Sequence, residues 1–204
     1  MKEFWNERYG KPEFAYGIEP NLYFKEKLKE LSPGKILLPA EGEGRNAVYA
    51  ATLGWDVYAY DISEEGKVKA DKLAKENGVS INYFVGTLDQ LEFEPESFDC
   101  IALIFAHLPR SIRQEQHQVL QTLLKPGGTL IVEVFSEEQL EFSAKNPTAG
   151  GPKSAEFLFK TEDLETDFDL CEMIHLNQEV VSLEEGLYHI GESSVVRCLG
   201  KKKQ

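Results

Sequence analysis

The segment from Ala40 to Ala47 reads Ala-Glu-Gly-Glu-Gly-Arg-Asn-Ala, a composition typical of a turn that brings the backbone close to a ligand. Gly42 and Gly44 permit the tight turn, and a helix that begins directly after them has free N–H groups that attract a carboxylate or a phosphate. Asp61 stands 19 residues after Gly42, a spacing at which a carboxylate can accept hydrogen bonds from ribose hydroxyls. Together these residues predict a site for a cofactor that contains adenosine.

Two histidines could act as a general base toward an acceptor amine or hydroxyl. His107 follows a predicted strand, on the edge of the sheet where ligands bind, and His189 lies in the segment Glu185-Gly186-x-x-His189. Each has a structural alternative. His107 could cap the helix that follows Pro109, and His189 could make a hydrogen bond at the end of a strand.

An alternating series of strands and helices must position these residues. Such alternation from about residue 20 to residue 135 predicts a mostly parallel sheet with helices on both faces, the α/β class. The predicted strands are 35–38, 56–60, 81–85, 98–104 and 129–135, and the predicted helices are 20–31, 45–53, 64–77 with Ser63 as cap, and 111–124.

The last third of the chain has a different pattern. Residues 137–153 are polar and rich in Gly and Pro, which predicts a long loop, and 161–164 predict a short capped helix. Two strand-like stretches, 170–183 and 193–199, are joined through Glu184-Glu185-Gly186 and predict an antiparallel hairpin at one edge of the sheet. The sheet therefore has seven strands in this interpretation.

Length and composition limit the function. With 204 residues, the chain has room for one α/β domain, and its net charge of −13 argues against a nucleic-acid partner. The beginning lacks the apolar core of a signal peptide, no stretch approaches the ~18 apolar residues of a membrane span, and Cys100, Cys171 and Cys198 resemble buried free thiols. We therefore expect a soluble, cytoplasmic protein. No metal motif is present, so no metal site is predicted.

A nicotinamide cofactor is one alternative, because Gly42-x-Gly44-x-x-Ala47 also fits a dinucleotide fingerprint. Three features oppose it. The chain is too short for a second nucleotide-binding half plus a substrate domain, Pro126-Gly127-Gly128 precedes the fifth strand, and the sheet is predicted to end in a hairpin.

Over nearly its whole length the chain resembles the class I S-adenosylmethionine-dependent methyltransferases, and within them the branch of tellurite-resistance and thiopurine-type enzymes. Any single matching segment is unspecific, but the ordered set is not. The segments are Phe4-Trp5-Asn6-Glu7-Arg8-Tyr9, Tyr16-Gly17-Ile18-Glu19-Pro20-Asn21, Glu41 to Ala47, Tyr60-Asp61-Ile62-Ser63, Phe98-Asp99, His107-Leu108-Pro109, Leu124-Lys125-Pro126-Gly127-Gly128, Gly150-Gly151-Pro152 and Glu185-Gly186-x-x-His189-x-Gly191.

The resemblance implies a Rossmann-like fold, S-adenosylmethionine as methyl donor and S-adenosylhomocysteine as product. The whole chain, 1–204, would be one domain. Within it, residues 1–31 would form a lid and a first helix, 35–135 the cofactor-binding core, and 136–199 the acceptor-side loop and the last strands. For the cofactor, the resemblance implies that Ala40 to Gly44 lie along the methionine part, that Asp61 binds the ribose, and that Ile62 and Leu88 lie beside the adenine. Phe105 and Ala106 would form the floor of the site, and Trp5, Tyr9 and Tyr16 would form a lid over the cofactor. A loop would bring His189 toward the acceptor.

The chain departs from the family pattern at several of these positions. Leu38 replaces an acid of the first strand, which removes an indirect contact to the methionine amine that Glu41 could restore. Pro39 and Ala40 stand where a Leu-Gly or Leu-Ala pair is common, and Glu41 stands where Cys or Gly is common. Thr87 replaces an Asp that contacts the adenine amine. A degenerate protein that binds S-adenosylmethionine without catalysis is therefore the main alternative to an enzyme.

The remaining charged residues have open roles at this point. Arg45 could pair with the cofactor carboxylate or with Glu41 or Glu43, and Arg110 and Arg113 could admit an anionic acceptor or be solvated. His117 is expected on a solvated helix face and His175 on an edge strand. The hypothesis is a methyltransferase acting on a small-molecule thiol, metalloid oxyanion or amine, with the oligomeric state open.

Overall fold

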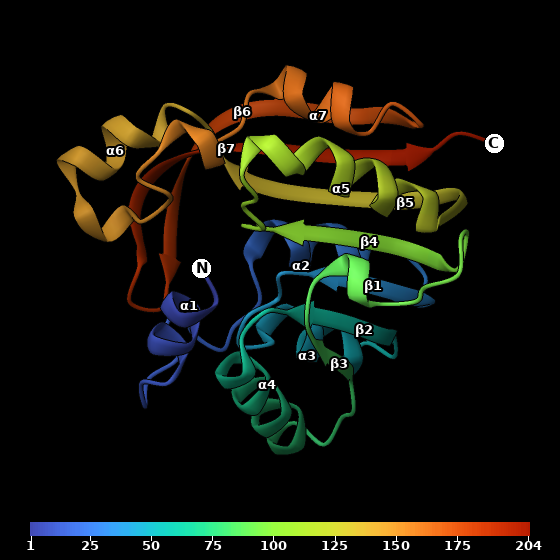
Figure 1. Ribbon diagram of the computed structural model, residues 1–204, viewed down its shortest axis with the longest axis horizontal. Coiled ribbons are helices and arrows are strands. Elements are labelled where there is room, and N and C mark those ends of the chain that lie inside the picture. The colour runs from blue at the N-terminus through green and yellow to red at the C-terminus, as the bar shows by residue number, and fades with distance from the viewer.

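A computed structural model describes residues 1–204, and its centre is a seven-stranded sheet (Figure 1). The strand order is β3-β2-β1-β4-β5-β7-β6; the first five strands are parallel, and β7 runs antiparallel to β5 and β6. The α/β fold with an antiparallel C-terminal hairpin is thereby confirmed. The strands are β1 Lys35–Pro39, β2 Asp56–Asp61, β3 Asn82–Val85, β4 Phe98–Ile104, β5 Leu124–Phe135, β6 Cys171–Glu185 and β7 His189–Lys202.

Helices cover both faces of this sheet, because the central strands are apolar on both sides. Leu37 and Ile101 belong to the core under α5 and α7, whereas Ile36 and Leu38 belong to the core under α2, α3 and α4; all four are fully buried. The helices are α1 Lys2–Tyr9, α2 Leu22–Lys29, α3 Arg45–Thr52, α4 Glu64–Glu76, α5 Arg110–Leu123, α6 Gln139–Lys145 and α7 Thr161–Asp167, with short turns η1 Leu88–Gln90, η2 Pro147–Ala149 and η3 Ala155–Phe157.

The N-terminal predictions need two corrections. The predicted helix 20–31 begins at Leu22, because the side chain of Asn21 accepts a hydrogen bond from Phe24 N and caps it, which leaves Pro20 outside. It is also the second helix, since the lid segment contains α1. Ser63 does cap α4, accepting a hydrogen bond from Gly66 N at 3.1 Å.

The C-terminal third also departs from the prediction. The expected loop 137–153 contains α6 and η2, because buried Gln139 donates to the carbonyls of Ala149 and Gly150 and accepts from Ser194 N, which orders a polar stretch. Strand β7 runs from His189 to Lys202, so it is longer at both ends than the predicted stretch 193–199. The three cysteines are buried and free, as predicted, and none of the helices combines the length and apolar character required to cross a membrane.

The hairpin of β6 and β7 bends past the carboxyl ends of the parallel strands toward α1 (Figure 1). Its turn meets the N-terminal segment, where Leu187 N donates to Ala15 O at 2.8 Å. Gly186 has a φ of +59°, and a Cβ there would lie 2.4 Å from Gly17 N. Only glycine allows this approach, so the N-terminal segment and the turn of the hairpin meet at the same edge of the sheet.

Candidate functional site

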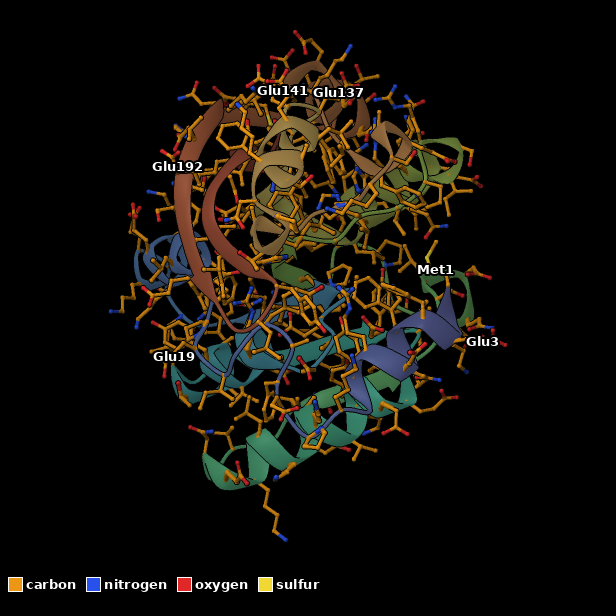
Figure 2. All side chains as sticks on the ribbon, turned by 90° about the vertical axis from the view of Figure 1, so that its left-hand side faces the viewer. Met1, Glu3, Glu19, Glu137, Glu141 and Glu192 are labelled. Carbon is orange, nitrogen blue, oxygen red and sulfur yellow. The ribbon has the colours of Figure 1, made fainter.

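A cavity of about 940 Å³ lies at the carboxyl edge of the parallel strands. This is near the upper end of the range for small-molecule sites, roughly 300–1,000 Å³. Figure 2 looks onto this edge, with α1 on one side and the hairpin on the other. Of the predicted site residues, Gly42 and Gly44 lie behind the cavity wall; those that line it are Trp5, Tyr9, Tyr16, Ala40, Glu41, Arg45, Asp61, Ile62, Thr87, Leu88, Phe105, His107 and His189.

The two glycines of the turn are needed for packing within the protein. Gly42 has a φ of +61°, and a Cβ there would lie 2.6 Å from the hydroxyl of Tyr9. Gly44 has a φ of +85°, and its Cβ would lie 2.5 Å from the Cβ of Ala70 on α4. The glycine pattern was interpreted as room for a ligand, whereas at these two positions it makes room for α1 and α4.

Asp61 at the end of β2 joins two loops. Its Oδ2 accepts a hydrogen bond from Gly42 N at 3.1 Å, and its Oδ1 accepts one from Ser63 N at 2.9 Å. Burial raises the pKa of Asp61, and these hydrogen bonds act against that rise. Each carboxylate oxygen has a second lone pair, so Asp61 can still accept two hydroxyls from the cavity.

Glu41 turns back onto the helix that follows it. Its Oε1 accepts hydrogen bonds from Asn46 N at 2.8 Å and Ala47 N at 2.7 Å, at the N-terminus of α3. Burial raises the pKa of Glu41 to about 7, against the opposing effects of these backbone groups and the charge of Arg45. The carboxyl group therefore titrates near neutral pH.

Arg45 has a partner that its position in the sequence did not indicate. Its Nη2 pairs with Glu185 Oε2 at 2.8 Å, and its Nη1 donates to Tyr16 O at 3.1 Å. Both members of the ion pair are buried. Neither Glu41 nor Glu43 is its ion-pair partner; Glu43 instead pairs with Lys69 at 2.7 Å.

The same Glu185 orients His189. Glu185 Oε2 lies 3.0 Å from His189 Nδ1, and Glu185 Oε1 accepts a hydrogen bond from Asn21 at 3.0 Å. Burial acts to raise the pKa of Glu185, but His189 and Arg45 outweigh it and lower that pKa to about 2. Burial also lowers the pKa of His189, against the attraction of Glu185. The imidazole is thus neutral near pH 7, with Nδ1–H donated to the carboxylate and Nε2 without a hydrogen bond.

The floor of the cavity is aromatic. The ring of Phe105 stacks on Phe135 at a centroid distance of 4.6 Å and meets the ring of His189 edge-on at 4.5 Å. Phe105 has a φ of +52° and Ala40 a φ of +53°, both outside the range that residues other than glycine usually adopt. Backbone strain is thus placed after two adjacent strands, β4 and β1, at the edge that lines the cavity.

His107 is held by the backbone through both ring nitrogens. Its Nδ1 lies 2.7 Å from Phe157 O, and Phe135 N donates to its Nε2 at 3.4 Å. Burial lowers the pKa of His107 to about 4. A neutral ring with both nitrogens engaged is poorly suited to act as a base, and helix α5 has Pro109 rather than His107 at its cap position.

Sequence reasoning did not single out Arg8, which also lines the cavity. Its guanidinium lies 4.6 Å from the ring centroid of Phe4 and 4.3 Å from that of Tyr188, and it donates to the Tyr16 hydroxyl at 2.8 Å. The other four arginines of the chain each pair with a carboxylate, and Arg8 does not. A signal was available, since Arg8 falls one turn after Phe4 within the N-terminal motif.

Two predictions for α5 were wrong. His117 is buried rather than solvated, with Nδ1 2.9 Å from Asp167, and Arg113 is buried with Nε 2.8 Å from the same carboxylate. The reason is α7, which packs on α5 and supplies Asp167. Arg110 is a partly exposed charge paired with Glu137 at 2.7 Å, and His175 does lie on the edge strand β6.

Thr87 stands at the adenine side of the predicted site. It forms a capping box with Gln90 around η1, in which Thr87 N donates to Gln90 Oε1 at 3.1 Å. The turn places Leu88 in the wall of the cavity and leaves Asp89 exposed.

Comparison with known proteins gives a family match for the middle of the chain. The profile of the methyltransferase domain family matches residues 36–128. A ubiquinone biosynthesis O-methyltransferase of Paraburkholderia phymatum is 34% identical over 128 residues, which cover 54% of this chain and 53% of that protein. The chain therefore spans about half the length of this curated relative.

Solved structures show the same fold. A structure from a study of the conversion of a disulfide bond into a thioacetal group during echinomycin biosynthesis has a TM-score of 0.78 at 16% identity, covering 100% of this chain and 92% of the other. TehB from Haemophilus influenzae has a TM-score of 0.72 at 16% identity, with 99% and 67% covered. Residues 36–128 thus match the methyltransferase domain family, the chain has the fold of these solved structures, and the cofactor that the match indicates is S-adenosylmethionine.

Proposed function

We propose that the chain is an active methyltransferase, which transfers the methyl group of S-adenosylmethionine to a hydroxyl or thiol of a small, largely apolar acceptor. The observation that supports this most is the Glu185–His189 pair, whose geometry leaves the Nε2 of a buried, neutral imidazole free in a cavity. A carboxylate that fixes one ring nitrogen while the other accepts a proton is the usual arrangement of a histidine base.

The residues of the cavity fit this cofactor. We assign Asp61 to the ribose, Ile62 and Leu88 to the adenine, and the backbone from Ala40 to Gly44 to the methionine part. Arg8, which lacks a carboxylate of its own, would receive the carboxylate of the amino-acid end. Trp5, Tyr9 and Tyr16 would cover the ligand from α1 and the segment after it, and one domain, 1–204, would supply both the cofactor and the acceptor side.

When bound, S-adenosylmethionine supplies a methyl group on a sulfonium cation that departs as a neutral thioether. His189 Nε2 takes the proton of the acceptor, and Glu185 holds the resulting imidazolium. The acceptor oxygen or sulfur would take the methyl carbon as the bond from that carbon to the sulfonium sulfur breaks, and the acceptor's proton would remain on His189. Phe105 and Phe135 exclude water beside the acceptor.

The acceptor classes differ in what they need from His189. An oxygen acceptor, as in the name of the Paraburkholderia relative, benefits from the base, and so does an amine. A thiolate or a metalloid oxyanion, as the tellurite-resistance and thiopurine resemblance implies, is already ionised. The apolar aromatic floor favours a hydroxylated or thiol-bearing ring over a bare oxyanion.

An acceptor screen tests the proposal. The protein is incubated with S-adenosylmethionine and, separately, phenols and catechols, aromatic thiols, tellurite, selenite and amines, and S-adenosylhomocysteine is measured. We expect turnover with a hydroxylated or thiol-bearing aromatic. Binding of S-adenosylmethionine with no turnover of any acceptor would instead favour a protein that binds the cofactor without catalysis.

A further inference from the structure

Four acidic residues line the cavity, Glu41, Glu43, Asp61 and Asp89. Three of them either have another partner or role or lie at the adenine side, away from the methionine part of the cofactor. Glu43 is paired with Lys69 and accepts from Ala15 N at 2.8 Å. Asp61 accepts two backbone N–H groups at the position we assign to the ribose, and Asp89 is exposed at the adenine side. Glu41 is the remaining acid, in the turn that we assign to the methionine part.

Glu41 has no cationic partner within the protein. Its two backbone hydrogen bonds both go to Oε1, and its other polar neighbour is the uncharged side-chain amide of Asn46. It takes part in no ion pair, because Arg45 beside it is bound to Glu185. Glu41 is part-buried, and neutral N–H groups are its only hydrogen-bonding partners, so a cationic ligand in the cavity would supply the counter-charge that the protein does not. The apolar neighbour Leu38 in β1 is fully buried and offers no second carboxylate.

We propose that Glu41 binds the α-ammonium group of S-adenosylmethionine through Oε2, while Oε1 remains on the N-terminus of α3. The inference rests on the assignment of this cofactor and extends it to a residue that decides how the amino-acid end is held. The sulfonium cation adds attraction of the same sign. Glu41 then discriminates ligands by the presence of an ammonium group.

The test compares three ligands by calorimetric titration. S-adenosylhomocysteine has the ammonium group, its deamino analogue lacks only that group, and 5′-methylthioadenosine lacks the whole amino-acid end. For Glu41→Gln we expect the affinity for S-adenosylhomocysteine to fall roughly 10- to 100-fold, the usual effect of losing a hydrogen bond between charged groups, while the other two ligands bind as they do to the unchanged protein.

Two outcomes would overturn the inference. Equal binding of S-adenosylhomocysteine by Glu41→Gln and the unchanged protein would show that no ammonium contacts Glu41. An equal loss for all three ligands would assign Glu41 only to the shape of the turn. Failure of the unchanged protein to bind any of the three would contradict the cofactor assignment instead.

A measurement on the unchanged protein covers the case in which Glu41→Gln does not fold. The ratio of affinities for S-adenosylhomocysteine and its deamino analogue should fall at least several-fold between pH 8 and pH 5.5, as Glu41 gains a proton. Both ligands meet the other titratable groups nearby, Arg45 on α3, Tyr83 on β3, Tyr9 on α1 and Asp61 on β2, so the ratio isolates the ammonium contact. A ratio that stays constant down to pH 4, below the ordinary carboxyl pKa of 4.5, would contradict the proposal.

Discussion

The cavity is built from two regions of different construction, the turn between β1 and α3 and the tip of the β6–β7 hairpin. In the turn, the acids Glu41 and Asp61 accept backbone N–H groups at most 19 residues away. At the hairpin tip, Glu185 binds the side chains of Asn21 and Arg45, 164 and 140 residues away. Local backbone geometry thus forms the proposed cofactor side, whereas long-range side-chain contacts form the proposed acceptor side.

The comparison predicts that changes at the tip and in the turn have different consequences. For His189→Ala we expect turnover to fall by roughly 10²–10⁴, the usual contribution of a general base, with little change in S-adenosylmethionine affinity. Steady-state kinetics and titration check this, with His175→Ala on the same hairpin as control. Unchanged turnover would give His189 a structural role only.

Among the substitutions considered, removal of the Glu185 carboxylate at the tip should lower the free energy of unfolding most. Glu185→Ala leaves Arg45 buried without a partner, which typically costs about 3–5 kcal/mol of unfolding free energy. Urea unfolding measures the loss, and Glu184→Ala at the neighbouring exposed position should change stability by less than about 0.5 kcal/mol. Equal effects of the two variants would mean that the buried network does not hold the tip.

In the turn, the expected effect is on affinity. Asp61→Ala should weaken S-adenosylmethionine binding by roughly 1.5–3 kcal/mol through lost hydrogen bonds to a charged group. Asp56→Ala, at the exposed opposite end of β2, is the matched control and should bind normally. Titration of both variants decides, and unchanged affinity for Asp61→Ala would remove this residue from the site.

Two glycine substitutions separate the stability loss caused by the close contact between the hairpin tip and the N-terminal segment from the loss caused by backbone strain alone. Gly186 and Gly54 both have positive φ, but a Cβ at Gly54 meets nothing within 4 Å. Gly54→Ala should cost about 1 kcal/mol from strain, and Gly186→Ala a further ~1–2 kcal/mol from contact with Gly17. Thermal unfolding compares the two, and equal losses would show that the tip can shift freely.

The smallest expected effect is a pH dependence in the turn. Because the pKa of Glu41 in the folded protein is raised to about 7, above the ordinary value of 4.5, its ionisation reduces stability as pH rises between these values. Glu41→Gln should therefore be more stable than the unchanged protein above pH 7, by on the order of 1–2 kcal/mol, and the difference should vanish near pH 4.5. Denaturant unfolding at pH 5 and pH 8 tests this; a pH-independent difference would show that the carboxyl group is not perturbed.

The sequence by itself determined the elements whose signals are local. Apolar runs and the turns that end them predicted β1 to β4 within one residue and the second half of β5, which begins at Leu124 rather than Thr129. Ser63 predicted the cap of α4, and the Gly-rich turn with Asp61 predicted the side that we propose for the cofactor. These signals hold because strands, caps and tight turns depend on residues next to one another in the chain.

Only the tertiary structure decided the partners of side chains that meet across the fold. Arg45 has Glu41 and Glu43 near it in sequence and pairs with Glu185; His117 faces α7 rather than solvent; and His107 is held by the carbonyl of Phe157, 50 residues away. No periodicity encodes such pairs, because they follow from how the hairpin and the last helices pack onto the sheet. The sequence therefore marked the edge where we propose that the cofactor binds, and packing decided which of the charged groups at that edge have no partner within the protein.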